Sequence, residues 1–242
     1  MTRNQNDLEI SSAGAIEHLL QHKPRQIRKL IAGGRGPRRE RIVELARRAG
    51  VAVEDRNQEG LRAVLHPYEY LELDRWLSEC PAKAIVVLLD HLEDPQNFGA
   101  ICRTAEALGI QGAIIPKDRS VEVTAGVYHA SVGGVANLPI VKVTNLSTTI
   151  KRLRDEGFWI VGTALSEKST EPSKVPDFDR VALVLGAEYD GMSEKLIDKC
   201  DWQVKIPLAG TVPSLNVSAA AAILFFEFTQ RLRAANPAEP PQ

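Results

Sequence analysis

Three short segments beyond residue 90 carry the side chains best suited to chemistry in this chain. The segments are residues 97–103, 185–188 and 206–216, and each lies where an apolar run of the strand type stops. Because the carboxyl ends of strands line the ligand crevice in an open α/β sheet, we expect these segments to share one pocket. Their polar side chains are Asn97, Arg103, Glu188, Ser214 and Asn216.

Several common catalytic classes lack their signatures here. The loop after the apolar run 84–90 has no GxGxxG pattern and no Walker loop occurs, which argues against a dinucleotide-dependent dehydrogenase or a P-loop enzyme. The cysteines are far apart with no CxxC pair, and no histidine lies in an HExxH pattern. We therefore expect neither a disulfide framework nor a metal site.

The composition is typical of a soluble globular protein, with 44% apolar and 25% charged residues. No apolar run approaches the roughly 18 residues that a membrane-spanning helix needs, so we expect no membrane association. The first residues contain no apolar signal core. We therefore expect a cytoplasmic protein.

The net charge of −1 hides a strongly basic segment. Residues 21–48 hold ten lysines and arginines against two acids, so the rest of the chain is acidic. A local positive field favours a polyanion such as RNA, although an ordinary solvated helix face is the alternative. The candidate RNA-binding residues are Arg35, Arg38, Arg39 and Arg41.

The first 83 residues predict a small α/β module. We expect a disordered tail at 1–12, a substrate-binding module at 13–77 and a linker at 78–83, where Pro81 interrupts the chain. Hydrophobic periodicity predicts helices at 14–20 and 39–49, and short strands at 27–32, 51–53 and 61–65.

Residues 84–233 alternate between strand and helix patterns, which predicts a mostly parallel sheet with helices on both faces. The predicted strands are 84–90, 112–115, 139–143, 158–165, 181–185 and 203–206. The predicted helices are 98–108, 121–131, 146–156, 193–199 and 217–233. We expect residues 234–242 to be disordered. The run 219–226 is more apolar than one sheet face needs, so the last helix is either deeply buried or covered by a second copy of the chain.

The three polar segments, with their flanks, resemble the motifs of a known family. Residues 94–105 look like the first motif of the SpoU/TrmH-type RNA 2′-O-ribose methyltransferases of the SPOUT superfamily. Residues 183–188 resemble the second motif, and residues 206–220 resemble the third. The motifs keep the order and spacing of the family. The basic module also resembles the ribosomal-protein-like substrate domain of the branch that methylates guanosine in 23S rRNA.

The resemblance implies S-adenosylmethionine as methyl donor, an obligate homodimer and a C-terminal trefoil knot. By position in the motifs, the donor would lie against the backbone of Gly186, Ile206 and Leu215. Arg103 would be the catalytic arginine. Since an arginine side chain stays protonated in proteins, a clamp on the RNA phosphate is a better role for it than a general base.

The remaining motif residues would arrange the site. Asn97, Ser214 and Asn216 would orient the hydroxyl and shape the donor site, with Asn97 acting from the loop or cap before the helix. Glu188 would hold a loop or Arg103 in place. Tyr189 departs from the small residue usual in the family, and its ring could narrow substrate entry or stack on a base.

The predicted activity is therefore methyl transfer to a ribose 2′-hydroxyl of RNA, with a guanosine of 23S rRNA as the leading target. A tRNA ribose methylase and an antibiotic-resistance rRNA methylase are alternatives in the same class. A non-catalytic RNA-binding protein is the alternative from another class. The sequence leaves the target RNA and its nucleotide open.

Overall fold

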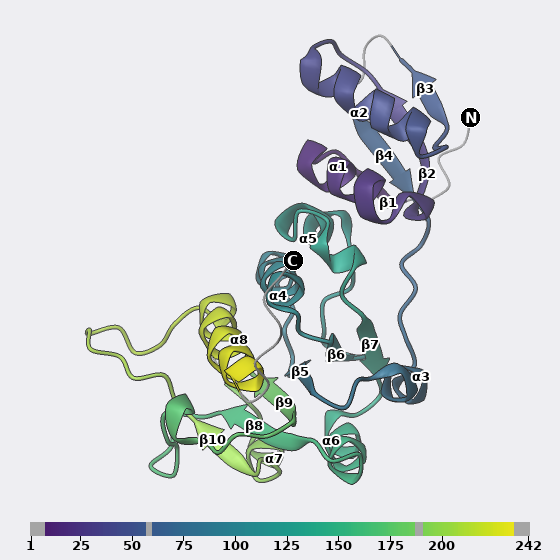
Figure 1. Ribbon diagram of the computed structural model, residues 1–242. Coiled ribbons are helices and arrows are strands. Elements are labelled where there is room, and N and C mark those ends of the chain that lie inside the picture. Colours follow the sequence, from purple (N-terminus) through teal and green to yellow (C-terminus); the bar gives the residue numbers. More distant parts are fainter. Residues whose placement is uncertain (1–7, 57–59, 187–190, 235–242) are drawn as a thin grey trace.

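The computed structural model describes residues 8–56, 60–186 and 191–234, which form two packed modules (Figure 1). The first module has a four-stranded sheet in the order β1-β4-β2-β3, in which β4 is antiparallel to both neighbours and β2 is parallel to β3. Its strands are β1 (Leu8–Ile10), β2 (Ile27–Ala32), β3 (Val53–Asp55) and β4 (Arg62–Leu65). Its helices are α1 (Ala13–His22), the short 3-10 helix η1 (Pro24–Gln26) and α2 (Pro37–Arg48).

Strand β1 corrects the expected disordered tail at residues 1–12. Leu8 pairs with Leu65 of β4, and Ile10 is buried in the core of the module. A three-residue strand carries no periodicity of its own, and its partner lies far along the chain, so the sequence gives no local sign of it. Residues 1–7 lie outside the described part of the chain.

The second module is built on a six-stranded sheet in the order β10-β8-β9-β5-β6-β7, in which every neighbouring pair is parallel. Its strands are β5 (Ala84–Leu89), β6 (Gly112–Pro116), β7 (Ile140–Val143), β8 (Trp159–Thr163), β9 (Arg180–Leu185) and β10 (Trp202–Val204). Its helices are α3 (Leu73–Glu79), α4 (Pro95–Leu108), α5 (Ala125–Ala130), η2 (Gly134–Ala136), α6 (Leu146–Asp155), η3 (Pro172–Lys174), α7 (Glu194–Ile197) and α8 (Val217–Ala234). The predicted parallel sheet covered by helices is confirmed.

Strand β5 shows why the sheet needs helices on both faces. Its Ile85 and Val87 belong to one apolar cluster with Phe98 of α4 and Phe225 of α8. Its Val86 and Leu88 belong to a second cluster, which contains Ile150 and Leu153 of α6. A continuous apolar run is therefore buried on both sides, as is typical of a central parallel strand.

The helix ends follow from local chemistry. Asn145 is the N-cap of α6, because its side chain accepts from the backbone N–H groups of Ser147 and Thr148 at 2.8 and 3.2 Å. Gly109 and Gly157 follow α4 and α6 with φ of +77° and +83°, which favours glycine.

Several element boundaries differ from those predicted, including those of α5 and β10. Helix α5 begins only at Ala125, because residues 117–124 form a loop, and β10 ends at Val204.

The boundary between the modules also differs from the predicted division at residues 78–83. Helix α3 packs with the second module, where the buried Trp76 indole donates to the backbone oxygen of Gln111 at 3.0 Å. A Cβ on Gly112 would lie 2.8 Å from the Trp76 Nε1, so the ring fills the space above that glycine. The segment that joins the modules is thus residues 66–72, ahead of α3.

Candidate functional site

The first and third polar segments meet at the carboxyl edge of the large sheet. The Asn216 Nδ2 donates to the Asn97 Oδ1 at 2.9 Å, across 119 residues of chain. Asn97 is 8% exposed and belongs to the first turn of α4, not to the loop before it as we expected. Two residues predicted from separate motifs are therefore in direct contact.

Hydrogen bonds at the N-terminus of a helix position each of these asparagines. Asp94 caps α4 by accepting from the backbone N–H groups of Gln96 and Asn97, both at 3.1 Å. Pro95 follows at the first helical position, where its missing N–H costs nothing. Asn216 precedes α8, and its Oδ1 accepts from the Ser218 backbone N–H at 2.9 Å. Capping fixes both carboxamides relative to the sheet.

A cavity of about 620 Å³ lies beside this contact, between the ends of β8, β9 and β10 and the start of α8. This volume falls within the range of about 300–1,000 Å³ that is typical of small-molecule sites. The cavity is lined by all three predicted donor-binding residues, Gly186, Ile206 and Leu215, and by Ser214. Its other walls are largely apolar and include Leu165, Met192, Leu208 and Leu224.

Gly186 occupies the tightest point of the cavity wall. A Cβ at this position would lie 2.0 Å from the Gly191 carbonyl carbon and 2.1 Å from the Met192 nitrogen. The chain that leaves β9 therefore returns directly over Gly186 with no room for a side chain. Because the backbone of Gly191 and Met192 lies so close to Gly186, main-chain groups form this part of the cavity wall.

Asp90 supports the same wall and was not predicted as a site residue. Its carboxylate is 3% exposed, accepts from the Ser193 backbone N–H at 3.0 Å and lies 2.6 Å from the His91 Nδ1. Its own backbone N–H donates to the Leu185 oxygen at 2.8 Å. The sequence feature that could have predicted this role is the position of Asp90, an acid at the end of the apolar run 84–89.

Arg103 does not line the cavity as it is described. Arg103 is exposed on α4, and it is not among the described residues that line the cavity. Its Cα lies where the chain of η2 packs on α4, 3.6 Å from a Cβ built on Gly134. Glu188 and Tyr189 lie outside the described residues.

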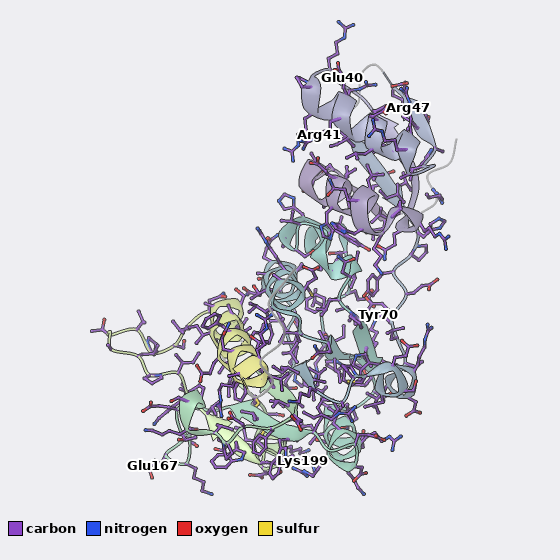
Figure 2. The ribbon with its side chains drawn as sticks, viewed as in Figure 1. Glu40, Arg41, Arg47, Tyr70, Glu167 and Lys199 are labelled. Carbon is purple, nitrogen blue, oxygen red and sulfur yellow. The ribbon has the colours of Figure 1, made fainter. Side chains whose placement is uncertain are left out.

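The predicted RNA-binding arginines divide into two pairs. Arg35 and Arg38 are exposed near the start of α2. Arg39 instead pairs with Asp55 and donates to the Ala32 backbone oxygen, and Arg41 pairs with Glu17 of α1. Figure 2 shows Arg41 and Arg47 on α2, at the end of the molecule far from Lys199. Part of the positive charge in this module is therefore used within the fold.

A metal-ligand cluster and a membrane-spanning helix are both absent from the described ranges. In residues 8–56, 60–186 and 191–234, no three His, Cys, Asp or Glu side chains gather as metal ligands would. No helix in the same ranges has the length and apolar character to cross a membrane.

The all-parallel sheet and the apolar cavity at its carboxyl edge define an α/β protein with a cavity of small-molecule size between its strand ends and its last helix. Residues 84–226 match the model of the SpoU rRNA methylase family. The match covers more than half of the chain, and the chain belongs to this family of RNA methyltransferases. The resemblance of the three motifs is thereby confirmed.

Relatives of known name agree with this assignment. A putative TrmH family tRNA/rRNA methyltransferase of Staphylococcus aureus (strain MSSA476) is 44% identical over 172 residues, which cover 70% of this chain and 69% of the relative. The corresponding protein of Staphylococcus saprophyticus is 43% identical over 176 residues, covering 72% of this chain and 70% of its own.

Solved structures share the fold. The SpoU methyltransferase AviRb from Streptomyces viridochromogenes, in complex with AdoMet (S-adenosylmethionine), has a TM-score of 0.79 at 24% identity and covers 97% of this chain and 95% of its own. An AdoMet-bound rRNA methyltransferase from Sinorhizobium meliloti has a TM-score of 0.74 at 23% identity, covering 94% and 88%. SpoU methyltransferases bind AdoMet, as these complexes show.

Proposed function

We propose that this protein transfers a methyl group from S-adenosylmethionine to a ribose 2′-hydroxyl of RNA, with a guanosine of 23S rRNA as its target in the cytoplasm. The observation that carries the proposal is the Asn216–Asn97 hydrogen bond beside the cavity lined by Gly186, Ile206 and Leu215. It brings together residues from motifs that the family shares, at a cavity of suitable size.

The cavity suits the donor. Its walls of leucine, methionine and valine side chains can cover an adenine ring, and the backbone around Gly186 and Ile206 can read the polar edge of that ring. We assign donor binding to Gly186, Ile206 and Leu215, and no step requires a metal.

When bound, S-adenosylmethionine would supply a sulfonium methyl group: the ribose 2′-oxygen bonds to the methyl carbon as the carbon–sulfur bond breaks, S-adenosylhomocysteine leaves, and the hydroxyl proton passes to water. The protein must then align two reactants, and alignment can contribute about 7–11 kcal/mol to lowering a barrier. We assign this task to Asn97, Ser214 and Asn216. The exposed guanidinium of Arg103 holds an RNA phosphate through a two-pronged contact. We assign to Glu188 the role predicted from its motif, which is to hold a loop or Arg103 in place.

We also propose that the donor segment is knotted and that the active protein is a homodimer. Residues 205–216 leave β10, pass the cavity and return to α8, which is the part of the chain that a trefoil knot would thread. On α8, Ile223 and Phe226 are 44% and 56% exposed on the same helical face. Leu165 and Val212, at 82% and 59% exposed, add to the apolar surface near the cavity.

Replacing Ile223 and Phe226 together with aspartate should convert the dimer to a monomer. Two charges placed in an apolar interface cannot be solvated there, so the dimer affinity should fall at least about 100-fold. Light scattering coupled to size-exclusion chromatography measures the mass directly. The exposed Gln21→Asp serves as a charge control that should stay dimeric. A double variant that keeps the dimer mass would exclude this face as the interface.

The exposed arginines of the first module should carry more of the RNA affinity than the paired ones. The double change Arg35→Ala and Arg38→Ala should weaken RNA binding and reduce the slope of log K against log salt by about 0.7–0.9 for each lost phosphate contact. Arg48→Ala is the matched control, because Arg48 pairs with Glu44 on the same helix. Fluorescence anisotropy over a salt series gives both slopes. An unchanged slope in the double variant would mean that this segment does not contact RNA.

The target can be identified in RNA from a strain that lacks the protein. Ribose methylation should disappear at one guanosine of the large-subunit rRNA and return when the gene is restored. Loss at a tRNA position instead would favour the tRNA methylase alternative. Loss at an antibiotic-binding nucleotide, with a change in drug sensitivity, would favour the resistance methylase. Donor binding in a calorimeter without methylation of any cellular RNA would favour the non-catalytic alternative.

A further inference from the structure

A pair of glycines separates the first module from the helix that carries Arg103. Gly133 has φ of +86°, and a Cβ there would lie 3.1 Å from both the Ala15 backbone oxygen and the His18 Cδ2 of α1. A Cβ on the adjacent Gly134 would lie 3.6 Å from the Arg103 Cα. The backbone of Gly133 and Gly134 thus lies between α1 and α4.

A hydrogen-bonded bridge spans the same place. The Asn137 Nδ2 donates to the Glu106 Oε1 of α4 at 3.3 Å and lies 3.0 Å from the His18 Nε2 of α1. One amide nitrogen carries two hydrogens, so it can donate to both partners when the His18 Nε2 is unprotonated. Glu106 is one helical turn beyond Arg103, so the bridge ends close to the predicted catalytic arginine.

The first module is held at two more points. The Tyr128 hydroxyl of α5 donates to the Gln26 Oε1 at 3.2 Å. In the joining segment, the Tyr68 hydroxyl donates to the Leu138 backbone oxygen at 3.2 Å, and the Tyr70 hydroxyl accepts from the Val123 N–H at 2.9 Å (Figure 2 labels Tyr70). These contacts hold the joining segment in place, while the His18–Asn137–Glu106 bridge reaches α4.

We propose that His18 and Asn137 are positioning residues that fix the angle between the first module and α4, and thereby select the nucleotide that reaches Arg103. This inference rests on the proposed function. RNA held at Arg35 and Arg38 would be presented to the site through the junction between the modules, so a small rotation there would move the ribose. A displacement of about 1 Å at a reacting centre can cost about 100-fold in rate.

The Asn137–His18 hydrogen bond should depend on pH, because it requires an unprotonated His18 Nε2. The pKa of His18 is lowered from its ordinary value of 6.5, first by burial and second by the His22 ring, whose centroid is 4.6 Å away, while Glu106 acts in the opposite direction. The neighbouring Glu17 side chain pairs with Arg41 of α2. Because the folded pKa is lowered, the bridge is fully formed above pH 6.5 and is lost as the pH falls through the folded value.

The test compares His18→Leu and Asn137→Leu, which remove the bridge, with His18→Gln, which keeps an acceptor for Asn137. Gln21→Ala on the exposed side of α1 is the control. On rRNA, kcat of both leucine variants should fall roughly tenfold, as expected for the loss of one or two hydrogen bonds. KM for RNA and donor affinity should stay within about twofold, because neither surface is touched. Some methylation should appear at neighbouring nucleotides.

The pH profile separates positioning from a general structural loss. Wild-type kcat on rRNA should fall as the pH drops below 6.5 by more than that of His18→Gln, because glutamine does not titrate in this range. Coincident profiles for the two proteins would count against the bridge.

Leucine variants that keep both kcat and the methylated nucleotide would overturn the proposal, and so would a loss confined to KM. If the wild-type protein methylates no RNA, the proposed function fails separately. Small-angle scattering then still tests the bridge, since both leucine variants should show a larger radius of gyration. An unchanged radius would contradict it.

Discussion

Arg103→Ala should strongly reduce methyl transfer while leaving S-adenosylmethionine binding within about twofold of wild type. The guanidinium is exposed on α4 and is not among the described residues lining the donor cavity, so its loss should not disturb the donor. If it holds the RNA phosphate during the reaction, its removal should lower kcat by on the order of 10²–10³-fold, as with other charge-stabilising donors. Transfer of labelled methyl to rRNA and calorimetric donor binding measure the two effects separately.

Two further variants sharpen this result. Arg103→Lys keeps the charge but loses the forked geometry, so it should be intermediate in rate. Arg152→Ala is the control, since Arg152 is half exposed on α6 and lies beside Asp74. Substantial turnover in Arg103→Ala would remove this arginine from the mechanism. Loss of donor binding would show that it acts at the cavity instead.

Gly186→Ala should abolish donor binding. The added Cβ would lie 2.0 Å from the Gly191 carbonyl carbon and 2.2 Å from its oxygen, and backbone at this position cannot swing aside as a flexible side chain could. The returning chain must shift, and the wall that we assign to the donor shifts with it. We expect donor affinity to fall at least about 100-fold, a loss of roughly 2.7 kcal/mol or more.

Gly60→Ala is the matched control, because a Cβ at Gly60 would meet nothing within 4 Å. Circular dichroism on Gly186→Ala shows whether the sheet itself remains folded. A folded Gly186→Ala that binds S-adenosylmethionine normally would place the donor site elsewhere.

Local pattern was enough to predict most of the large sheet. The β5 run is apolar at every position because both of its faces are buried, and this run is visible without any knowledge of its partners. Gly109 and Gly157 stop their helices through their own backbone conformations. Strand β1 and the placement of Trp76 depend instead on contacts with residues far along the chain, which periodicity does not report.

In the candidate site, too, the residues in motifs could be predicted from the sequence, whereas contacts between distant residues could not. Gly186, Ile206 and Leu215 were predicted from motifs and line one cavity, and Asn97 meets Asn216. The pairing of Arg39 with Asp55 and of Arg41 with Glu17 could not be predicted, since each acid lies on a different element. The His18–Asn137 contact joins residues 119 positions apart and has no motif at all. Such contacts need the fold before they can be recognised.

The most direct test of the central claim is the chemical position of the transferred methyl group. Purified protein should be incubated with rRNA and S-adenosylmethionine labelled in its methyl group, and the RNA then hydrolysed in alkali, which cleaves only next to a free 2′-hydroxyl. We expect the label to remain in alkali-stable dinucleotides, because the 2′-oxygen carries the methyl group. Label released in mononucleotides would mean that a base is methylated, and the account would be wrong.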